Sequence, residues 1–356
     1  MQKIAIIGTT SWGITLGLML ANKGLEVRLW ARTEREARKI RRNGPDPARC
    51  PDVTLPPQLT TTSRLAEALA DIDAVILAVP SATIRQNISQ IESHLNKATL
   101  VVSAAKGLEI GSNKRMSQVI AEEINPRFQP NICVLSGPNL AREIQQDLPA
   151  AAVVAAEDTA TARKAQRLLS APNFCVFTNT DVIGVELGGA LKNIIALGAG
   201  IADGLGYGDN AKAAFITRGL TEITALGMAL GANPLTFSGL AGLGDVIATC
   251  TSPLSRNHYV GTELAKGRPL AEITDSMTEV AEGINTTLVV RNLAQQLGLE
   301  MPIAEKIHQV LYEDADPRQA AAELMGANTK HELSGRKWRL FSLFRRRRRP
   351  ATTTET

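Results

Sequence analysis

The sequence predicts an α/β fold in which a doubly wound parallel sheet domain is followed by an all-α C-terminal domain. Through the first half of the 356 residues, short apolar runs of strand length alternate with helix-like segments. This alternation is typical of a parallel sheet with helices on both faces. From Asp181 onward the strand-like runs stop, and helix-compatible segments follow one another. The chain is also longer than one hydrophobic core usually supports, which favours two domains.

The first domain is expected over residues 1–180. Strands are expected at Lys3–Ile7, Glu26–Trp30, Ala74–Val79, Thr99–Ser103, Ile132–Leu135, Ala151–Ala155 and Phe174–Phe177. Helices are expected between them, including Trp12–Lys23, Glu34–Arg42, Ala82–His94 and Met116–Ile124. Right-handed connections between parallel strands make this a Rossmann-type fold, which binds its ligand at the carboxyl ends of the strands.

The second domain, expected over residues 181–335, is interpreted as a helical substrate-binding and catalytic domain. Helices are expected over 181–203, 209–231, 257–266, 278–297, 302–312 and 317–326, with glycine-rich turns at Gly204–Gly208 and Gly239–Gly244. Residues 336–356 follow as a basic tail that includes the run Arg345–Arg349. We expect this tail to be disordered and solvated, and a weak peripheral contact with an anionic lipid surface is the alternative.

Composition argues against several classes of protein. The formal net charge is only +4, and without the arginine run of the tail it would be slightly negative, so the folded part does not resemble a nucleic-acid-binding protein. The cysteines and histidines are scattered without metal-ligand spacing, so no metal site is expected, and the thiols are expected to be buried and reduced. The longest apolar stretch, Val182–Ala202, contains Glu186 and Lys192, which argues against a membrane span. Since no signal peptide is recognisable, we expect a cytoplasmic protein.

Lys192 lies in the run Gly188–Asn193, inside an otherwise apolar helix of small residues. A lysine in such a helix contributes little to solubility. A desolvated amine beside an amide side chain can instead transfer a proton to or from a carbonyl oxygen. We therefore expect Lys192 to be a catalytic acid or base.

The run Gly8–Gly13 joins the first strand to the first helix and has the arrangement of a dinucleotide-binding turn. Gly8 and Gly13 are in the positions that the tight turn and close helix–strand packing require. Thr10, however, stands where the G-x-G-x-x-G pattern has its middle glycine. The motif alone therefore leaves a turn without a nucleotide as an alternative.

Arg32 follows the second strand, where many dinucleotide-binding domains have an acidic residue for the ribose 2′-hydroxyl. Arg32, with Arg35 nearby, can accommodate a 2′-phosphate instead, so NADPH is supported at least as well as NADH. The alternative is that these arginines belong only to an exposed helix start.

Two later strand ends bring polar groups to the same edge of the sheet. Lys106 follows the fourth strand and is expected to point toward an anionic substrate or cofactor, although a surface lysine in a turn is the alternative. Gly137 and Asn139 follow the fifth strand, where backbone N–H groups and the amide side chain can bind a polar ligand.

The segment Ser255-Arg256-Asn257 begins a helix that Ser255 is suited to cap. A helix N-terminus with serine, arginine and asparagine can bind a phosphate, whereas an ordinary capped helix with an ion-paired arginine is the alternative. Asp245, just upstream, can hold a substrate hydroxyl or orient Lys192. Glu282 can contact a cofactor or merely begin a loop.

Together these motifs resemble bacterial NAD(P)-dependent glycerol-3-phosphate dehydrogenase from Lys3 to about Met325. The shared strings are G-x-x-S-W-G (Gly8 to Gly13), V-P-S (Val79 to Ser81), K-G-L-E (Lys106 to Glu109), S-G-P (Ser136 to Pro138), G-V-E-L-G-G-A-L-K-N (Gly184 to Asn193), G-L-G-D (Gly242 to Asp245), S-R-N (Ser255 to Asn257) and E-G (Glu282-Gly283). Thr10, Asn139 and the arginine tail depart from the family pattern.

The resemblance implies a cytoplasmic enzyme that interconverts dihydroxyacetone phosphate and sn-glycerol 3-phosphate with NADPH or NADH and supplies glycerophospholipid synthesis. It implies that Lys192 is the general acid or base. Substrate would be held by Lys106, Gly137, Asn139, Lys192, Asp245, Ser255, Arg256 and Asn257. Cofactor would be held by Gly8, Ser11, Trp12, Gly13, Arg32, Lys106, Ala141, Arg256, Val280 and Glu282. A homodimer is expected by analogy only.

The sequence leaves a hydroxyacid dehydrogenase and a non-catalytic sensor open as alternatives, and it argues against a nucleotide-sugar dehydrogenase. A hydroxyacid dehydrogenase of the same architecture also places a lysine on the first interdomain helix, although the S-R-N segment favours a phosphorylated substrate. A nucleotide-sugar dehydrogenase would need a nucleophilic cysteine, and Cys250 has no recognisable activating base. A non-catalytic dinucleotide sensor would bind cofactor without turnover.

Overall fold

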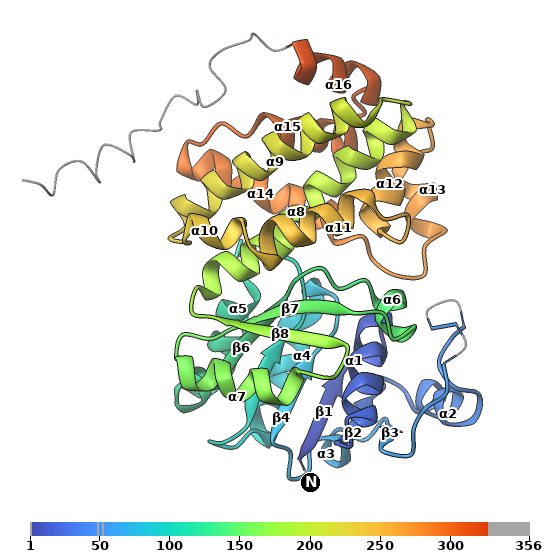
Figure 1. The fold of residues 1–356 in the computed structure, drawn as a ribbon, viewed down its shortest axis with the longest axis vertical. Helices are drawn as coiled ribbons and strands as arrows, with labels where there is room; N and C mark the ends of the chain where they lie inside the picture. Colours follow the sequence, from blue (N-terminus) through green and yellow to red (C-terminus); the bar gives the residue numbers. More distant parts are fainter. Residues whose placement is uncertain (1, 48–49, 52, 327–356) are drawn as a thin grey trace, which may run out of the picture.

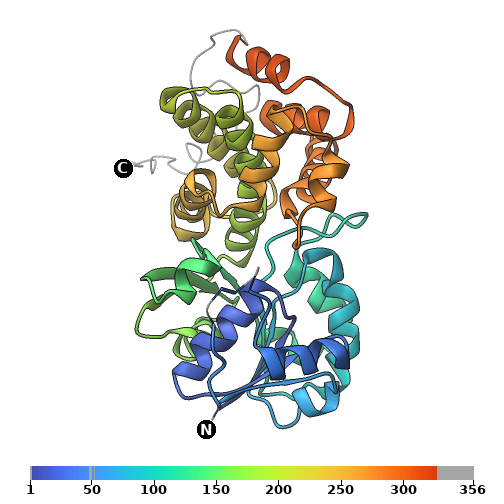
Figure 2. The ribbon, with the colours of Figure 1, turned by 90° about the vertical axis from the view of Figure 1, so that its right-hand side faces the viewer.

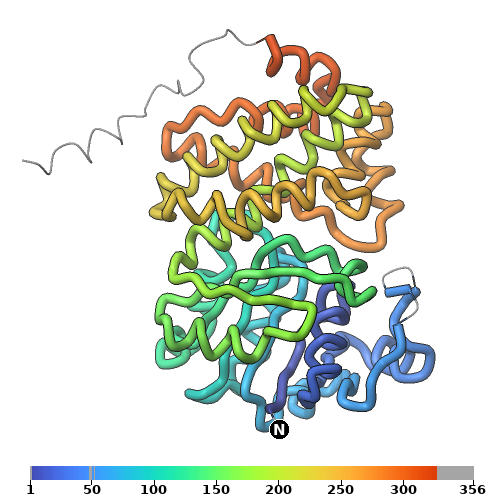
Figure 3. The backbone as a smooth tube through the Cα atoms, viewed as in Figure 1, coloured from blue at the N-terminus to red at the C-terminus, as the bar shows by residue number. Residues whose placement is uncertain are grey.

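A computed structural model describes residues 2–47, 50–51 and 53–326. The first part of the chain is built on one sheet, and after β8 the regular elements of the described residues are helices (Figure 1). The colour sequence in Figure 3 separates the same two halves, blue to green and yellow-green to orange-red. The tail expected at residues 336–356 lies outside the described residues.

The sheet of the described residues has eight strands in the order β3-β2-β1-β4-β5-β6-β7-β8. The strands are β1 Lys3–Ile7, β2 Glu26–Trp30, β3 Leu59–Thr62, β4 Ala74–Leu77, β5 Leu100–Ser103, β6 Ile132–Ser136, β7 Ala150–Ala155 and β8 Phe174–Asn179. The Rossmann-type fold class is confirmed, and each predicted strand is present.

Two details of the sheet differ from the prediction. β7 runs antiparallel to β6, with Val134 opposite Ala155, whereas the other strand pairs are parallel. The connection between β6 and β7 contains only the short helix α6 (Ala141–Gln145), and the chain returns in the opposite direction. β3 was not predicted, because its sequence Leu-Thr-Thr-Thr is a short edge strand without an apolar run.

Helices cover both faces of the sheet (Figure 2). They are α1 Ser11–Asn22, α2 Glu34–Asn43, α3 Leu65–Ala68, α4 Ile84–Ile91, α5 Met116–Glu123, α6 and α7 Thr159–Leu169, with 3₁₀ turns at Ser81–Thr83, Glu92–His94 and Pro126–Asn131. Successive residues of β1 point to opposite faces. Ile4 and Ile6 pack in the core with α1 and α7, and Ala5 and Ile7 pack with α4 and α5.

The helical half is organised around α8 (Val182–Gly204), which packs against α9, α11, α12 and α14. The other elements are α9 Asp209–Ala229, α10 Pro234–Phe237, a π-helix at Leu240–Gly244, α11 Asp245–Thr251, α12 Arg256–Ala265, α13 Leu270–Asp275, α14 Glu282–Leu297, α15 Pro302–Tyr312 and α16 Pro317–Gly326. The turn at Gly204–Gly208 is confirmed. The turn predicted at Gly239–Gly244 is wrong, because most of it is the π-helix that leads into α11.

α8 is long and apolar enough to cross a membrane by length and composition, but 83% of its most apolar window is buried inside the structure. It therefore has the burial of a core helix. Cys50, Cys133 and Cys250 are buried free thiols, as expected. Cys175 is exposed on the edge strand β8, which corrects the prediction for that residue.

The first turns of α8 join the two halves closely. A Cβ atom at Gly189 would lie 2.3 Å from Ser136 Oγ at the end of β6, so a larger residue there would force the Ser136 hydroxyl to move. Glu186 accepts hydrogen bonds from Ser117 N at 2.7 Å and from Arg115 Nη1 at 2.5 Å, at the start of α5. Lys192 follows Glu186 on α8 by somewhat less than two turns and is thereby held at a fixed place above the sheet.

Candidate active site

A cavity of about 630 Å³ lies where the carboxyl ends of β1, β4, β5 and β6 face the helical half. Eleven of the predicted site residues line it: Ser11, Trp12, Lys106, Asn139, Ala141, Lys192, Ser255, Arg256, Asn257, Val280 and Glu282. They come from strand ends of one half and helix ends of the other. The fold therefore brings together residues that are far apart in the sequence.

The remaining predicted residues do not line this cavity. Gly8 and Gly13 shape the turn behind it, while Gly137 and Asp245 lie behind lysine side chains that do line it. Arg32 is exposed after β2 and has no hydrogen-bond or ionic partner among the described residues. Its side chain is thus available beside the β2 end without being part of the enclosed space.

Two lysines share one carboxylate at the inner end of the cavity. Lys192 Nζ lies 2.7 Å from Asp245 Oδ1, and Lys106 Nζ lies 2.6 Å from Asp245 Oδ2. Lys192 also donates to Thr249 Oγ1 at 2.5 Å, and Lys106 donates to the Gly137 carbonyl at 2.7 Å. Asp245 is 1% exposed and Lys192 is 7% exposed, so the group is largely shielded from water.

Burial lowers the pKa of Lys106 to about 8, because desolvation disfavours its charged form and Lys192 adds like-charge repulsion, while Asp245 opposes both effects. With its pKa lowered in this way, Lys106 can pair with an anion in its charged form and can also exchange a proton. The arrangement therefore provides both positive charge and acid–base chemistry at one place.

A chain of amide hydrogen bonds fixes the neighbouring helices. Asn257 donates to Asn193 Oδ1 at 2.9 Å and accepts from the Gly283 N–H at 2.9 Å, and Asn193 donates to the Lys106 carbonyl at 3.3 Å. These contacts connect α8, α12, α14 and the loop after β5. Asn193, the amide beside Lys192, thus has a structural role in holding the site together.

Asn139 has no such partner. Both polar atoms of its side chain are buried, and neither has a hydrogen-bond partner among the described residues. Leaving a buried amide unsatisfied costs about 1–3 kcal/mol. Because Asn139 lines the cavity, its amide is positioned to bind a polar ligand there.

The first βα turn tolerates threonine at its middle position. Thr10 has φ −68°, and its hydroxyl caps α1 by accepting from Gly13 N at 3.1 Å. The same hydroxyl donates to the Ala78 carbonyl at the end of β4 at 2.7 Å. Gly8 has φ +115°, and a Cβ atom there would lie 2.6 Å from that same carbonyl, so glycine is required.

Carboxylates from the helical half lie at the outer end of the cavity. Glu279 accepts hydrogen bonds from Ser11 N at 2.8 Å and from Ser11 Oγ at 3.1 Å. Glu282 accepts from Ser81 N at 2.8 Å and from Ser81 Oγ at 2.5 Å. Burial raises the pKa of Glu282, which the Ser81 hydrogen bonds and the charge of Arg256 oppose.

Arg256 is placed between these carboxylates and the helix that it begins. Its Nη1 donates to the Val280 carbonyl at 2.8 Å and lies 3.6 Å from Glu279 Oε2, and its side chain is 50% exposed. Ser255 caps α12 by accepting from His258 N at 3.2 Å, as the sequence predicts. The helix predicted from residue 278 begins instead at Glu282, because the preceding Ala281 has an extended backbone.

Sequence reasoning missed two side chains of this site. Thr249 is four residues after Asp245 on α11, and i,i+4 spacing would have placed the two together if a helix had been expected there. Glu279 had no local signal, because its partner Ser11 is 268 residues away in the sequence.

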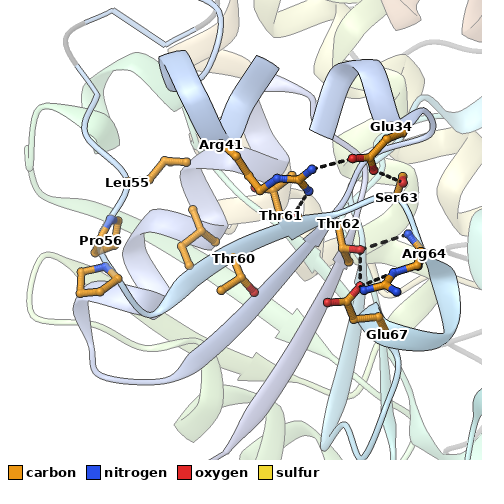
Figure 4. Close-up of a pocket in the computed structure, with 12 residues that line it drawn as sticks. Glu34, Arg41, Leu55, Pro56, Thr60, Thr61, Thr62, Ser63, Arg64 and Glu67 are labelled. Atoms are coloured by element: carbon orange, nitrogen blue, oxygen red, sulfur yellow. Dashed lines mark hydrogen bonds and ion pairs between the residues drawn. The ribbon is translucent and has the colours of Figure 1, made fainter. Parts of the chain in front are cut away.

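A larger hollow of about 930 Å³ lies elsewhere, beside the edge strand β3 (Figure 4). Its charged groups are paired with one another: Glu34 lies 2.7 Å from Arg41, and Glu67 lies 2.8 Å from Arg64. Arg41 also donates to the Thr61 carbonyl of β3 at 2.8 Å. None of the predicted site residues lines this hollow, and its mutually paired charges favour a structural role.

One group of metal-ligand type occurs among the described residues, formed by Glu305, His308 and Glu313. Arg291 lies 3.1 Å from Glu305 and 3.2 Å from Glu313, so both carboxylates already have a guanidinium as their ionic partner. This arrangement favours an ion-paired cluster over a cation site.

The sheet, the glycine-containing turn and the lysine cluster together define a dinucleotide-dependent dehydrogenase built from a Rossmann-type half and a helical half. Family models for the N-terminus and the C-terminus of NAD-dependent glycerol-3-phosphate dehydrogenase match residues 3–162 and 181–322. The chain belongs to the NAD-dependent glycerol-3-phosphate dehydrogenase family, which confirms the resemblance found in the sequence.

Individual relatives agree with this family. A glycerol-3-phosphate dehydrogenase (NAD(P)+) of Dehalococcoides mccartyi is 62% identical over 349 residues, which cover 98% of this chain and 97% of that protein. The enzyme of the same name from Geobacter metallireducens is 47% identical over 331 residues, covering 93% and 99%. The crystal structure of a Coxiella burnetii glycerol-3-phosphate dehydrogenase has a TM-score of 0.87 at 36% identity and covers 91% of this chain and 99% of that one.

Proposed function

We propose that this protein reduces dihydroxyacetone phosphate to sn-glycerol 3-phosphate, reversibly and with NADPH or NADH, and so supplies glycerophospholipid synthesis. The observation that carries the proposal is the buried Lys192–Asp245–Lys106 cluster at the inner end of the cavity in a chain of this family. Its small-molecule partner is then a phosphorylated three-carbon ketone or alcohol.

Lys192 is the proposed general acid for ketone reduction and general base for the reverse reaction. Its ammonium is held by Asp245 and Thr249, which fix the direction of its remaining N–H toward the cavity that it lines. When bound, the reduced nicotinamide supplies a hydride to C2 of the ketone. Lys192 donates a proton to the oxygen on that carbon, a contribution typically worth ~10²–10⁴-fold in rate.

The other substrate roles follow from where charge and unsatisfied hydrogen-bonding groups lie. Arg256 and the N-terminus of α12, with Ser255 and Asn257, would hold the phosphate. Lys106, with Gly137 behind it, and the unpartnered amide of Asn139 would hold the polar groups of the three-carbon unit. Binding the phosphate away from the reacting carbon would orient C2, which can lower a barrier by up to ~7–11 kcal/mol.

The residues around the first turn fit a dinucleotide. Gly8 and Gly13 allow the close approach of α1 to the sheet, and the Ser11 N–H already binds an anionic group, the carboxylate of Glu279. Ser11 and the neighbouring Trp12 would hold the pyrophosphate side, with Ala141 opposite. Lys106, Arg256, Val280 and Glu282 would contact the nicotinamide side, and Arg32 would bind a 2′-phosphate.

Several finer features belong to the same proposal. Residues 1–180 would form the dinucleotide-binding domain and residues 181–335 the substrate domain. The enzyme would act in the cytoplasm, with a homodimer as the proposed assembly. The basic tail at 336–356 would make at most a weak, salt-sensitive contact with anionic vesicles, which deleting residues 340–356 should abolish.

The test follows absorbance at 340 nm with purified protein and either NADPH or NADH. Oxidation that requires dihydroxyacetone phosphate supports the proposal, and an Arg32→Ala variant should lose preference for NADPH over NADH. Oxidation that depends on an unphosphorylated 2-ketoacid instead would favour a hydroxyacid dehydrogenase. Cofactor binding without turnover on any of these substrates would favour a sensor.

A further inference from the structure

The carboxylate of Glu279 occupies the helix N-terminus at which the cofactor's pyrophosphate is proposed to bind. Its two oxygens accept from the backbone N–H of Ser11 at 2.8 Å and from the Ser11 hydroxyl at 3.1 Å. Ser11 is the first residue of the 12-residue helix α1, whose N-terminus attracts anions through N–H groups that have no acceptor within the helix and through its partial positive charge.

The contact joins the two halves of the molecule. Glu279 belongs to the segment 276–281 between α13 and α14, which lines the cavity opposite the first βα turn. Its side chain is only 13% exposed, so the hydrogen bonds to Ser11 are largely shielded from water. Arg256 holds the same segment through the Val280 carbonyl at 2.8 Å, and its Nη1 also lies 3.6 Å from Glu279 Oε2.

A pyrophosphate and this carboxylate require the same donors. Ser11 offers one backbone N–H and one hydroxyl, and Glu279 engages both. Two anions placed together at one helix end would also repel each other. The neighbouring carboxylate, Glu282, does not compete in this way, because it binds Ser81 after β4.

We propose that Glu279 is an internal competitor for the dinucleotide, occupying the position of the pyrophosphate until the cofactor displaces it. Affinity for NADPH and NADH is then lower than the site would otherwise give, by the free energy of the Glu279–Ser11 contact. The inference rests on the proposed function, because it requires that α1 receives the pyrophosphate.

The experiment compares cofactor binding to wild type and Glu279→Gln by titrating tryptophan fluorescence with NADPH in the absence of substrate. Glutamine keeps a hydrogen-bond acceptor for Ser11 but removes the charge that the helix N-terminus stabilises. We expect the dissociation constant of NADPH to fall by about 2- to 30-fold, the range that a charge at a helix end contributes. Glu272→Gln, which removes an equal charge from the exposed face of α13, is the matched control and should bind like wild type.

A second readout uses thermal unfolding. Without cofactor, Glu279→Gln should unfold at a lower temperature than wild type, because it loses an anion at the start of α1. At one fixed NADPH concentration, its ligand-induced stabilisation should be the larger of the two.

Equal or weaker NADPH binding by Glu279→Gln, or the same tightening in Glu272→Gln, would overturn the competitor role while the proposed function stands. If neither NADPH nor NADH binds wild type or variant, the proposed function itself fails, and the inference fails with it.

Discussion

The inner and outer ends of the cavity hold their charges in different ways. At the inner end, the Asp245 carboxylate lies between two ammonium groups, 2.7 Å from Lys192 and 2.6 Å from Lys106. The carboxylate therefore offsets only part of the positive charge of the two ammonium groups, and the buried group keeps an excess of positive charge. Breaking such a group leaves an uncompensated charge away from water, which is costly.

At the outer end, the hydrogen bonds of the carboxylates come from neutral groups. Glu279 and Glu282 accept hydrogen bonds from the backbones and hydroxyls of Ser11 and Ser81, and the neighbouring cation, Arg256, is half exposed. Apart from the ion pair of Glu279 with the half-exposed Arg256 at 3.6 Å, the partners of these carboxylates are uncharged groups of the sheet half. These contacts can be exchanged for a ligand's groups at a smaller cost than the lysine cluster can.

The difference indicates that the two ends of the cavity serve different steps of the reaction. A rigid inner end of ion-paired groups suits the step in which a proton is transferred to one atom, because its donors are already oriented. An outer end of exchangeable contacts suits the binding and release of a large cofactor. Substitutions at the two ends should therefore change different measured quantities.

Lys192→Ala should have the largest effect. We expect kcat to fall by ~10²–10⁴-fold, because the proposed acid is lost, while the dissociation constant of NADPH changes only slightly. Steady-state kinetics and a fluorescence titration measure the two quantities. Lys39→Ala, on the exposed side of α2, is the control for loss of a lysine. Turnover within a few-fold of wild type would remove Lys192 from the chemistry.

Asp245→Asn should primarily reduce stability. It leaves two ammonium groups facing each other in a buried place, so we expect the free energy of unfolding to fall by about 3–5 kcal/mol. Denaturant titration measures this loss. The double variant Lys106→Met/Asp245→Asn also removes one of the two ammonium groups. It should therefore recover part of the lost free energy of unfolding. A loss in the double variant equal to the sum of the losses in Lys106→Met and Asp245→Asn would mean that the carboxylate and Lys106 are not coupled.

Arg256→Ala should raise KM for dihydroxyacetone phosphate by about 10- to 100-fold, the range of a hydrogen bond to a charged group. The effect on kcat should be smaller, since the guanidinium is proposed to bind the phosphate and not the reacting carbon. Arg163→Ala, on the exposed side of α7, serves as the comparison. An unchanged KM would place the phosphate elsewhere.

The smallest effect is a pH dependence from Glu282. Burial raises its pKa, so the folded state binds this proton more tightly than the unfolded state does. Stability from this group is therefore fully present at pH below the ordinary carboxyl range and is lost as pH rises through the raised folded value. Glu282→Gln cannot titrate, so it should lose less unfolding free energy than wild type over that range.

Glu222 also lowers the free energy of unfolding as pH rises. It does so in wild type and in Glu282→Gln alike, so its contribution must be subtracted from both profiles. Burial raises its pKa to about 7, against the hydrogen bonds it accepts from Ile303 N and Ala304 N. The stability that protonated Glu222 contributes is therefore lost between about pH 4.5 and about pH 7. Parallel pH profiles for wild type and Glu282→Gln would show that Glu282 is not buried as described.

Much of the fold was predictable because its signals are local. The apolar runs of β1 and β4 and the small-residue helix α8 can be read from short windows of sequence. β3 was missed because Leu-Thr-Thr-Thr is held in place by its pairing with β2 and not by its own hydrophobicity. The π-helix at Leu240–Gly244 was missed because three of the six residues from 239 to 244 are glycines, which favour a turn in isolation.

The residues of the site also fall into those that the local sequence identifies and those that depend on tertiary contacts. Lys192 was identifiable because a charge in an apolar helix stands out without any knowledge of its partners. Its contacts with Asp245 and Thr249 depend on how α11 packs against α8, which no short window contains. Glu279 is the extreme case, because only the folded chain brings it to Ser11.

Thr10 affects whether a search by sequence pattern detects this enzyme family in genome sequences. A search pattern that requires glycine at the middle position of the turn passes over this chain. The threonine there fits at φ −68°, with its hydroxyl between Gly13 N and the Ala78 carbonyl. A pattern that also admits serine and threonine at this position, and retains glycine where φ is positive at Gly8, would detect turns of this kind.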